Sequence, residues 1–569
     1  MNPVTNGTND LSVLYAMVLS KLVPIFRGVV LRSNLRYPMT AILQIWMKLR
    51  INIIMDTTFK KFIRQYWLLL LIVLLKMILQ FIVVNPYYEL HRDEFLHLDQ
   101  ANHLAFGFIS VPPFTSLVSK VIFLLGGSLF WIRFFPAMFG ALTIVFAWLT
   151  VEAIDGKLPA KILVSGALLF SVIARINILF QPNSFDILAW TVIFYLFVKF
   201  IQSANPKWLW CLAFTIAAGV YNKYNLGFLL IGLTAGLLLT PQRNIFLNKS
   251  VWKACLVLMI LLLPNGIWQI VHHFPVIEHM KVLKASQLDN NSAVGFLIDQ
   301  VLYFSGSLLV IVGGLAGLIF YKPFRPYRFI GISFIVILVL FALLKAKGYY
   351  ALGIYPVLLA FGSVYIEKVL TRKWKPAVVS MLFAVNLLVF ILTFYIIYPV
   401  YLPAQIKQHA TGFEKLGMLR WEDGQNHAIP QDFADMTGWK EMAAKSLEAY
   451  KKIPVDQLKN TLVFCDNYGQ TGALNYYNRG KMPEAYSFNT DYIYWIPAIN
   501  RIQNIVLIGK IPAKEILNMF ASYKVTGEVK NEFSREKGTK IILLIGAKSP
   551  FTKLFYKMVE EKKAKFDIF

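Results

Sequence analysis

One short segment of this sequence holds the residues best suited to acid–base chemistry. Directly after an apolar run, residues 85–95 read Asn-Pro-Tyr-Tyr-Glu-Leu-His-Arg-Asp-Glu-Phe, which sets Asp93 and Glu94 beside a histidine and an arginine. A carboxylate in this position can act as a general base toward a hydroxyl, because burial against neighbouring helices sets its pKa and its orientation. The alternative is a solvated loop in which Arg92 pairs with Asp93. We take Asp93 and Glu94 as candidate catalytic residues and Arg92 as a candidate anion-binding residue.

Lysines at the ends of two other apolar runs suit an anionic ligand. Lys223 lies in a Tyr-Asn-Lys-Tyr-Asn stretch, and Lys345 and Lys347 open the stretch Lys-Ala-Lys-Gly-Tyr-Tyr. An ammonium group held at a membrane surface can neutralise a phosphate and stabilise it as a leaving group. The alternative is an interfacial lysine that extends toward the headgroups. Tyr349 and Tyr350 can stack on a ring-shaped ligand or belong to an interfacial aromatic belt.

Two further stretches carry polar side chains beside apolar runs. Their candidates for binding a ligand are Gln181, Asp186, His272, His273, Glu278 and His279. The spacing of the histidines and the glutamate matches no zinc motif. Hydrogen bonding to ligand hydroxyls, or capping of helix ends, is the favoured interpretation. We therefore expect no metal or other cofactor to be required, with a divalent cation as the less favoured alternative.

Long apolar segments must position these candidates. The chain is 57% hydrophobic and 15% charged, whereas soluble domains are about 45 to 50% apolar. Windows of about twenty apolar residues recur between Tyr66 and Pro399, and each is long enough to cross a bilayer core of about 30 Å as a helix. We predict about eleven membrane spans. They cover residues 67–84, 131–151, 161–177, 184–201, 207–220, 225–240, 252–271, 299–320, 327–344, 350–367 and 376–398.

Basic residues mark alternate connections between these spans. The basic side chains at the predicted inner connections are Lys157, Lys161, Lys199, Lys207, Arg243, Lys249, Lys253, Lys322, Arg325, Arg328, Lys368, Arg372, Lys373 and Lys375. Positively charged loops stay in the cytoplasm. This pattern places every candidate residue named above on the non-cytoplasmic side of the membrane.

The apolar windows stop after Pro399, which divides the chain into a membrane domain over residues 65–400 and a soluble domain over 401–569. The soluble domain is predicted to be α/β and non-cytoplasmic. Its predicted elements are strands over 461–466, 504–509 and 540–545 and a helix over 513–523.

The N-terminal extension, residues 1–64, has two interpretations. It forms an amphipathic interfacial segment, or its start is mis-assigned and translation begins at Met55. The net charge of +26 lies mainly in short loops and terminal segments. That distribution favours membrane topology and anionic lipid headgroups over nucleic acid. Three cysteines cannot build a disulfide framework or a metal cluster.

Several motifs occur together in a specific combination. They are Arg92-Asp-Glu-Phe, His103-Leu-Ala-Phe-Gly-Phe followed by Val-Pro-Pro-Phe114, Lys223-Tyr, Pro264-Asn-Gly-Ile-Trp-Gln with its histidine-rich tail, and Lys347-Gly-Tyr-Tyr. The set resembles bacterial members of glycosyltransferase family 39, which include protein O-mannosyltransferases and lipid A aminoarabinose transferases and share the GT-C membrane fold. The resemblance covers about residues 65–400. Asp435-Met-Thr-Gly-Trp and Asn467-Tyr-Gly-Gln-Thr-Gly resemble a soluble domain attached to a bacterial subset of the family.

The resemblance implies an enzyme that moves a hexose or pentose from a polyprenyl-phosphate donor, with undecaprenyl as the expected carrier. Asp93 would deprotonate or orient the acceptor hydroxyl, Glu94 belongs to the same motif, and Lys223 and Lys347 would meet the donor phosphate. Attack at the anomeric carbon would invert its configuration. The acceptor would be a lipid, a glycan or a protein on the outer face of the bacterial cytoplasmic membrane.

Two other classes of protein fit the architecture. A transporter or flippase of a lipid-linked sugar also has many spans and buried ionisable residues. The polar candidates here lie at span ends on one side, with few at mid-membrane depth, which argues against it. A scaffold that recruits partners through its C-terminal domain explains the topology but gives no purpose to Asp93 and Lys223.

Overall fold

The computed structural model describes residues 57–564 and divides the chain at Leu70 into two compact units. The unit Leu71–Phe569 carries every candidate residue. Residues 1–56 of the predicted N-terminal extension lie outside the residues that the structure describes.

Long apolar runs form the helices that cross the membrane. Within residues 57–564, seven helices are long and apolar enough to do so, and two bent helix pairs bring the number to as many as nine. The long helices are α3 (Thr57–Ile82), α6 (Leu129–Ala153), α9 (Pro182–Ser203), α12 (Lys249–Val271), α16 (Arg328–Leu343), α17 (Tyr355–Val369) and α18 (Lys375–Ile397). α16 and α17 reach this length together with the 3-10 turns that precede them, from Lys322 and from Gly348. The bent pairs contain α11 (Leu226–Leu238), which ends in a bend of 108°, and α14 (Ala293–Tyr303) with α15 (Leu308–Phe320), bent by 64°. The prediction of a polytopic, mostly helical protein is confirmed.

Each predicted span coincides with helical residues, but two of them are divided. The span predicted over residues 299–320 falls on the bent pair α14 and α15, and a second span is broken into two helices. Residues 161–177 form α7 (Leu158–Leu169) and the short α8 (Val172–Ile176). The break follows from Ser171, whose hydroxyl accepts a hydrogen bond from the Ile173 amide at 3.3 Å and so starts a new helix. The span predicted over residues 207–220 is α10 (Lys207–Asn222).

Close packing holds these helices together where small residues allow it. A Cβ on Gly362 of α17 would lie 1.8 Å from the Val310 carbonyl oxygen of α15. The two backbones approach so closely that only glycine fits, as is common in membrane helix pairs. Two shorter helices, α4 (Arg92–Asp99) and α5 (Phe114–Leu124), follow α3 and precede α6. Pro113 is the N-cap of α5, so the paired prolines end the preceding loop.

Residues after 400 form helices around one mixed sheet. The helices are α19 (Pro403–Gln408), α20 (Ala410–Lys415), α21 (Gln431–Ala434), α22 (Trp439–Tyr450), α23 (Tyr468–Tyr477), α24 (Tyr492–Trp495), α25 (Lys514–Leu517) and α26 (Pro550–Lys563). The strands are β1 (Thr461–Cys465), β2 (Ala485–Ser487), β3 (Asn504–Gly509), β4 (Phe520–Glu528) and β5 (Lys540–Ala547), in the order β2-β1-β3-β5-β4. β1 pairs in parallel with β2 and β3, whereas β5 is antiparallel to β3 and β4.

The three predicted strands are confirmed, but the helix predicted over 513–523 is wrong in its second half. Only α25 (Lys514–Leu517) is helical there, and β4 begins at Phe520. Pairing with β5 decides the outcome, because tertiary contacts override the helical pattern of a short segment.

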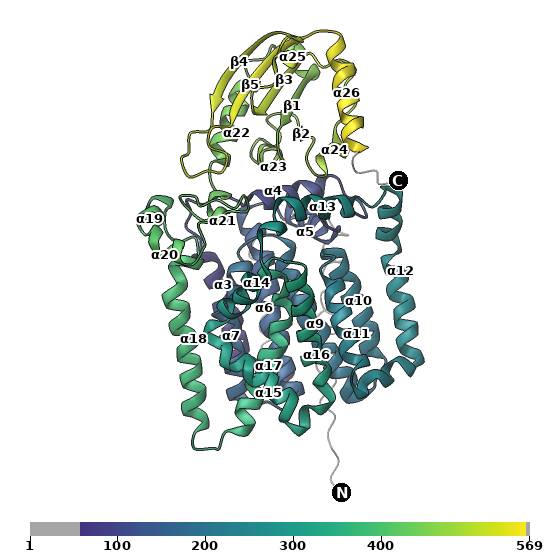
Figure 1. Ribbon diagram of the computed structural model, residues 1–569, viewed down its shortest axis with the longest axis vertical. Helices are drawn as coiled ribbons and strands as arrows, with labels where there is room; N and C mark the ends of the chain where they lie inside the picture. Colours follow the sequence, from purple (N-terminus) through teal and green to yellow (C-terminus); the bar gives the residue numbers. More distant parts are fainter. Residues whose placement is uncertain (1–56, 565–569) are drawn as a thin grey trace, which may run out of the picture. The chain divides into compact units, whose positions relative to one another are not determined.

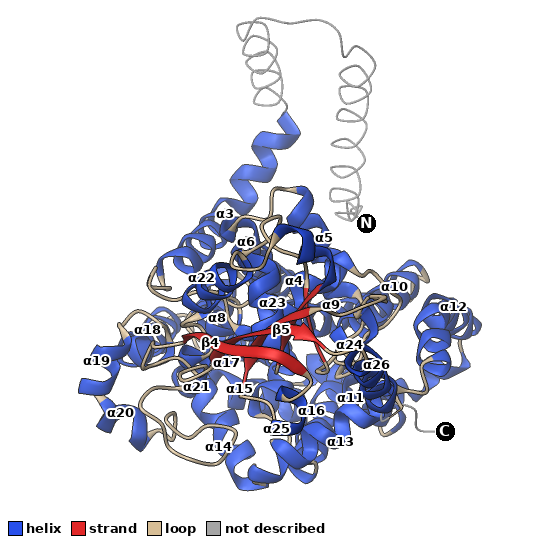
Figure 2. Cartoon of the chain, turned by 90° about the horizontal axis from the view of Figure 1, so that it is seen from above, coloured by secondary structure: helices blue, strands red, loops and turns tan. Residues whose placement is uncertain are grey.

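A hydrophobic core joins the C-terminal domain to α4. Phe95 and Leu98 of α4 lie in one buried cluster with Trp439 and Met442 of α22 and Val463 of β1. In Figure 1 the sheet lies beyond one end of the helical bundle, with α4 between them. Figure 2 shows the strands crossing the centre of the bundle as seen from above. Helix α4 and the C-terminal domain therefore form one packed layer over the membrane helices.

Candidate active site

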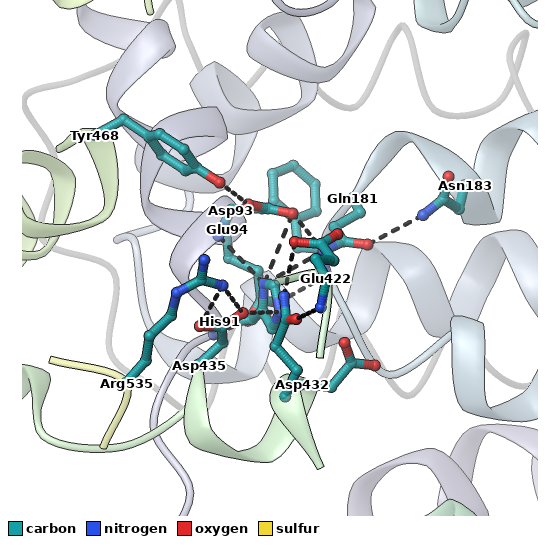
Figure 3. A network of polar contacts seen from close by, with 12 residues as sticks. His91, Asp93, Glu94, Gln181, Asn183, Glu422, Asp432, Asp435, Tyr468 and Arg535 are labelled. Carbon is teal, nitrogen blue, oxygen red and sulfur yellow. Dashed lines mark hydrogen bonds and ion pairs between the residues drawn. The ribbon is translucent and has the colours of Figure 1, made fainter. Parts of the chain in front are cut away.

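Asp93 lies in the first turn of α4, and side chains from two distant parts of the chain hold its carboxylate. The Tyr468 hydroxyl donates to Oδ1 at 2.6 Å, and Gln181 Nε2 donates to Oδ2 at 3.2 Å (Figure 3). His91 is the N-cap of α4, and its Nδ1 lies 3.8 Å from Oδ2. The Asp93 side chain remains 36% exposed. A ligand can therefore reach a carboxylate whose two oxygens are already fixed.

The surroundings keep Asp93 ionised. Burial alone would raise its pKa, but the charges of His91 and Arg92 and the hydrogen bond from Tyr468 outweigh burial and lower the pKa to about 2. The Arg92 guanidinium also lies over the Tyr468 ring, 4.4 Å from its centroid. Asp93 is thus an anionic acceptor of hydrogen bonds at neutral pH.

An unbroken chain of hydrogen bonds connects Asp93 to Lys223. Gln181, which donates to Asp93, accepts at Oε1 from Asn183 Nδ2 at 3.0 Å, and Asn183 Oδ1 accepts from Lys223 Nζ at 2.8 Å. Gln181 is the N-cap of α9, and Lys223 ends α10. The structure therefore brings Asp93 and Lys223, both candidates from the sequence, into one network.

Aromatic rings cover the Lys223 ammonium. Its Nζ lies 4.3 Å from the centroid of the Tyr350 ring and 5.3 Å from that of Tyr349. Asn225 Nδ2 ties the turn in place by donating to Asp186 at 2.9 Å and to the Tyr350 carbonyl at 3.0 Å. Buried Asp186 also accepts from Trp190 at 3.0 Å, so it supports the turn from below.

The Asn and Gln of the motif that begins at Pro264 support the same turn. Asn265 Oδ1 accepts from the Tyr224 hydroxyl at 3.0 Å, and Gln269 Nε2 donates to that hydroxyl at 2.9 Å. Asn265 Nδ2 donates to the Phe106 carbonyl at 2.7 Å. Helix α12 thus holds both the Lys223 turn and the loop that follows α4.

Lys347 carries an ion pair with a residue of the C-terminal region. Its Nζ lies 2.7 Å from Glu422 Oε1, and Gln431 Nε2 donates to Glu422 Oε2 at 2.8 Å. Burial would raise the pKa of Glu422, but Lys347 outweighs burial and lowers it. Lys347 stays close to the site through its neighbours Tyr349 and Tyr350, whose rings contact Lys223.

Glu94 has a different environment from Asp93. Its side chain is fully buried, and its carboxylate accepts from Arg133, from the Phe180 amide and from the His91 amide, at 2.6, 2.6 and 2.7 Å. The bond to His91 belongs to a capping box that starts α4. This carboxylate anchors the helix to α6 and to the start of α9.

The remaining predicted residues lie outside this network. Lys345 is exposed, and His272 stacks on Trp268 with ring centroids 4.1 Å apart. His273 has a positive φ of 56° in the turn before α13 (Pro275–Ser286). Glu278 pairs with Lys281 at 3.2 Å, and burial lowers the pKa of His279. Within residues 57–564 no group of three or more His, Cys, Asp or Glu side chains is arranged to hold a metal ion.

Sequence reasoning did not identify the residues that the C-terminal domain brings to the site. Tyr468 contacts Asp93, and Glu422 contacts Lys347. Asp435 lies 3.7 Å from His91 Nε2 and 3.3 Å from Arg535 (Figure 3). Tyr468 and Asp435 lie inside the two motifs that resembled a known soluble domain. The sequence therefore marks these two motifs, but they lie more than 300 residues after Asp93, so no local pattern shows that they contact it.

Comparison with known proteins supports the fold and gives a family match over part of the chain. The family described as dolichyl-phosphate-mannose-protein mannosyltransferase matches residues 110–268, a stretch that includes Gln181, Lys223 and Asn265 but not Asp93. No curated protein sequence matches significantly. ArnT from Cupriavidus metallidurans bound to undecaprenyl phosphate is 13% identical, with a TM-score of 0.55 over 84% of this chain and 98% of that one. Apo ArnT from the same organism gives a TM-score of 0.57 at the same identity and coverage. The chain is therefore a multi-pass membrane protein with a fold similar to that of ArnT, and residues 110–268 match the dolichyl-phosphate-mannose-protein mannosyltransferase family.

Proposed function

We propose that this protein transfers a hexose or pentose from a polyprenyl-phosphate donor, with undecaprenyl as the carrier, to an acceptor hydroxyl or phosphate. The observation that carries the proposal is the hydrogen-bonded chain from Asp93 through Gln181 and Asn183 to Lys223. It sets an ionised carboxylate and an ammonium group on one short network. ArnT, which shares the fold, has been solved with undecaprenyl phosphate bound.

In the proposed reaction, Asp93 accepts the proton of the acceptor hydroxyl while that oxygen attacks the anomeric carbon. The bond from the anomeric carbon to the phosphate oxygen breaks, and its electron pair leaves with the polyprenyl phosphate. Lys223 and Lys347 neutralise the charge that develops on this leaving group. Attack opposite the leaving group inverts the configuration. Glu94 holds α4 in place, and Tyr349 and Tyr350 shape the donor site.

The proposed location is the outer face of the bacterial cytoplasmic membrane, with the soluble domain over residues 401–569 in the periplasm. The basic connections between alternate spans support this orientation. An acceptor lipid, glycan or protein would then reach Asp93 from the same side as the C-terminal domain.

The test uses purified protein, a panel of undecaprenyl-phosphate sugars and membrane extract as the source of acceptor. Loss of donor and appearance of glycosylated product should occur with the wild type and disappear in Asp93→Asn. Asp99→Asn is a matched control, because it changes another buried aspartate of α4 that accepts from Asn475 and Asn102. Donor that binds to the wild type without any turnover would instead favour a transporter of lipid-linked sugars.

A further inference from the structure

We propose that Tyr468 is a positioning residue for Asp93, so that the C-terminal domain supplies part of the acceptor site. The inference rests on the proposed function, since it concerns how the catalytic carboxylate is presented. Tyr468 comes from a domain that begins more than 300 residues after Asp93, and its hydroxyl lies 2.6 Å from Asp93 Oδ1.

The first step of the argument is geometric. Tyr468 and Gln181 each donate to a different oxygen of Asp93, at 2.6 and 3.2 Å. A carboxylate offers about four lone-pair directions. Two donors on opposite oxygens therefore fix the plane of the carboxylate and leave acceptor capacity for a substrate hydroxyl. A base held in one orientation favours proton transfer in the attacking geometry.

The second step is that Tyr468 is itself rigidly held. Asn467 caps α23 by accepting from the Gln470 amide at 3.1 Å. Glu536 accepts from Asn467 at 3.2 Å and from Gln470 at 2.6 Å, which locks the first turn of α23. Arg92 covers the Tyr468 ring from the other side, 4.4 Å from its centroid. The hydroxyl therefore has little freedom to leave Asp93.

The third step is that this contact depends on docking of the whole domain. Phe95 of α4 packs its ring 5.6 Å from Trp439 of α22 and 5.8 Å from Tyr476 of α23. The Arg92 amide donates to the Asp435 carbonyl at 3.1 Å. These contacts anchor α4 to the C-terminal domain. They keep α23, which carries Tyr468, next to the first turn of α4, which carries Asp93.

The charge on Asp93 offers a readout that a purely structural role would not change. Titratable and charged groups face it from every neighbouring element, namely His91, Arg92, His97, Tyr468, Asp435, Lys347 and Tyr349. The Tyr468 hydrogen bond acts with His91 and Arg92 to lower the pKa of Asp93. Removing only the hydroxyl should raise that pKa and move the acid limb of the activity profile to higher pH.

The experiment compares full-length wild type with Tyr468→Phe, Tyr476→Phe and Asp93→Asn. Tyr476 is a matched control because it lies on the same helix and packs on Phe95. Infrared titration, with the Asp93 band identified by its loss in Asp93→Asn, should show a raised pKa in Tyr468→Phe only. With the donor that the wild type turns over, kcat of Tyr468→Phe should fall roughly ten- to hundredfold, as expected for loss of a hydrogen bond to a charged group. KM for the donor should not change.

Unchanged titration and unchanged kcat in Tyr468→Phe, with Asp93→Asn inactive, would overturn the positioning role and leave the proposed function intact. A wild type that turns over no donor would remove the proposed function and the positioning role together, even if infrared titration still reported the contact. A loss of kcat shared by Tyr476→Phe would assign the effect to packing of α23 and would also overturn the proposal.

Discussion

The loop between α4 and α5 packs against α12 at Gly107, where there is no room for a side chain. A Cβ on Gly107 would lie 2.2 Å from the Trp268 ring of α12. The ring cannot easily move, because it stacks on His272 with centroids 4.1 Å apart. This contact fixes the loop between α4 and α5, so Gly107 affects the candidate site through backbone position.

Gly107→Ala should therefore lower stability by about 1 to 3 kcal/mol, the usual cost of overpacking. The measurement is the apparent melting temperature in detergent. Gly266→Ala on α12 is the control, because a Cβ there has no neighbour within 4 Å. Adding Trp268→Leu to Gly107→Ala should restore stability, and a failure to do so would assign the loss to the backbone.

A second residue-scale prediction concerns pH. Asp491 is buried between the C-terminal domain and the loop after α4, where it accepts from the Ile109 amide at 2.5 Å and from Gln100 at 2.9 Å. Burial raises its pKa to about 6, and these hydrogen bonds only partly oppose burial. The folded state therefore binds more protons than the unfolded state between about pH 4 and 6. Stability should fall as pH rises through this window.

Asp491→Asn should remove this dependence, so the variant should gain stability relative to wild type between pH 4.5 and 7.5, by about 2 kcal/mol. Apparent melting temperatures at the two pH values measure the change. Asp456→Asn, an exposed residue of the same domain, serves as the control. Equal pH dependence in wild type and Asp491→Asn would contradict the assignment.

At the scale of elements, a turn of the C-terminal region places Glu422 beside Lys347. The turn, residues 419–427, is closed by the His427 amide donating to the Leu419 carbonyl at 2.8 Å. Asp423, the next residue, pairs instead with His427 at 2.9 Å. The Glu422 carboxylate thus neutralises the Lys347 ammonium. A donor phosphate that binds Lys347 would have to displace this carboxylate.

Glu422→Gln should strengthen binding of undecaprenyl phosphate, because Lys347 would keep its charge without a competing anion. The expected gain is about tenfold in Kd, or about 1.4 kcal/mol. Titration of purified protein with undecaprenyl phosphate measures it, and Asp423→Asn on the same turn is the matched control. Weaker binding in Glu422→Gln would show that Glu422 orients Lys347 for the ligand instead of competing with it.

Elements differ in how far the sequence predicts them. The apolar spans and β1, β3 and β5 were predictable, since each is a run whose hydrophobic pattern matches its buried faces. β4 was not, because its residues 520–525 are largely exposed and its strand conformation comes from pairing with β5. Ser171 divides a span through a single hydroxyl, which no apolar pattern records.

At the scale of the whole molecule, the residues that the membrane domain contributes to the candidate site could be named from the sequence, and those from the C-terminal domain could not. The candidates from the membrane domain lie next to the ends of apolar runs, namely Asp93, Gln181 and Lys223. The order of the spans is therefore enough to predict that they lie at the same end of the helical bundle. Tyr468 and Glu422 reach them only because a hydrophobic core docks the C-terminal domain on α4. Contacts across several hundred residues depend on tertiary packing, which local patterns do not encode.

The orientation of the molecule in the membrane gives the last prediction. Arg372 is exposed in the connection between α17 and α18, at the end of the bundle away from the sheet, and Lys524 is exposed on β4 (Figure 1). If basic connections are cytoplasmic, a membrane-impermeant maleimide should label Lys524→Cys in sealed spheroplasts. It should label Arg372→Cys only after detergent is added. The unsubstituted protein, which has exposed Cys211, gives the background. The opposite labelling pattern would place the C-terminal domain and Asp93 on the cytoplasmic side, where a periplasmic acceptor could not reach them.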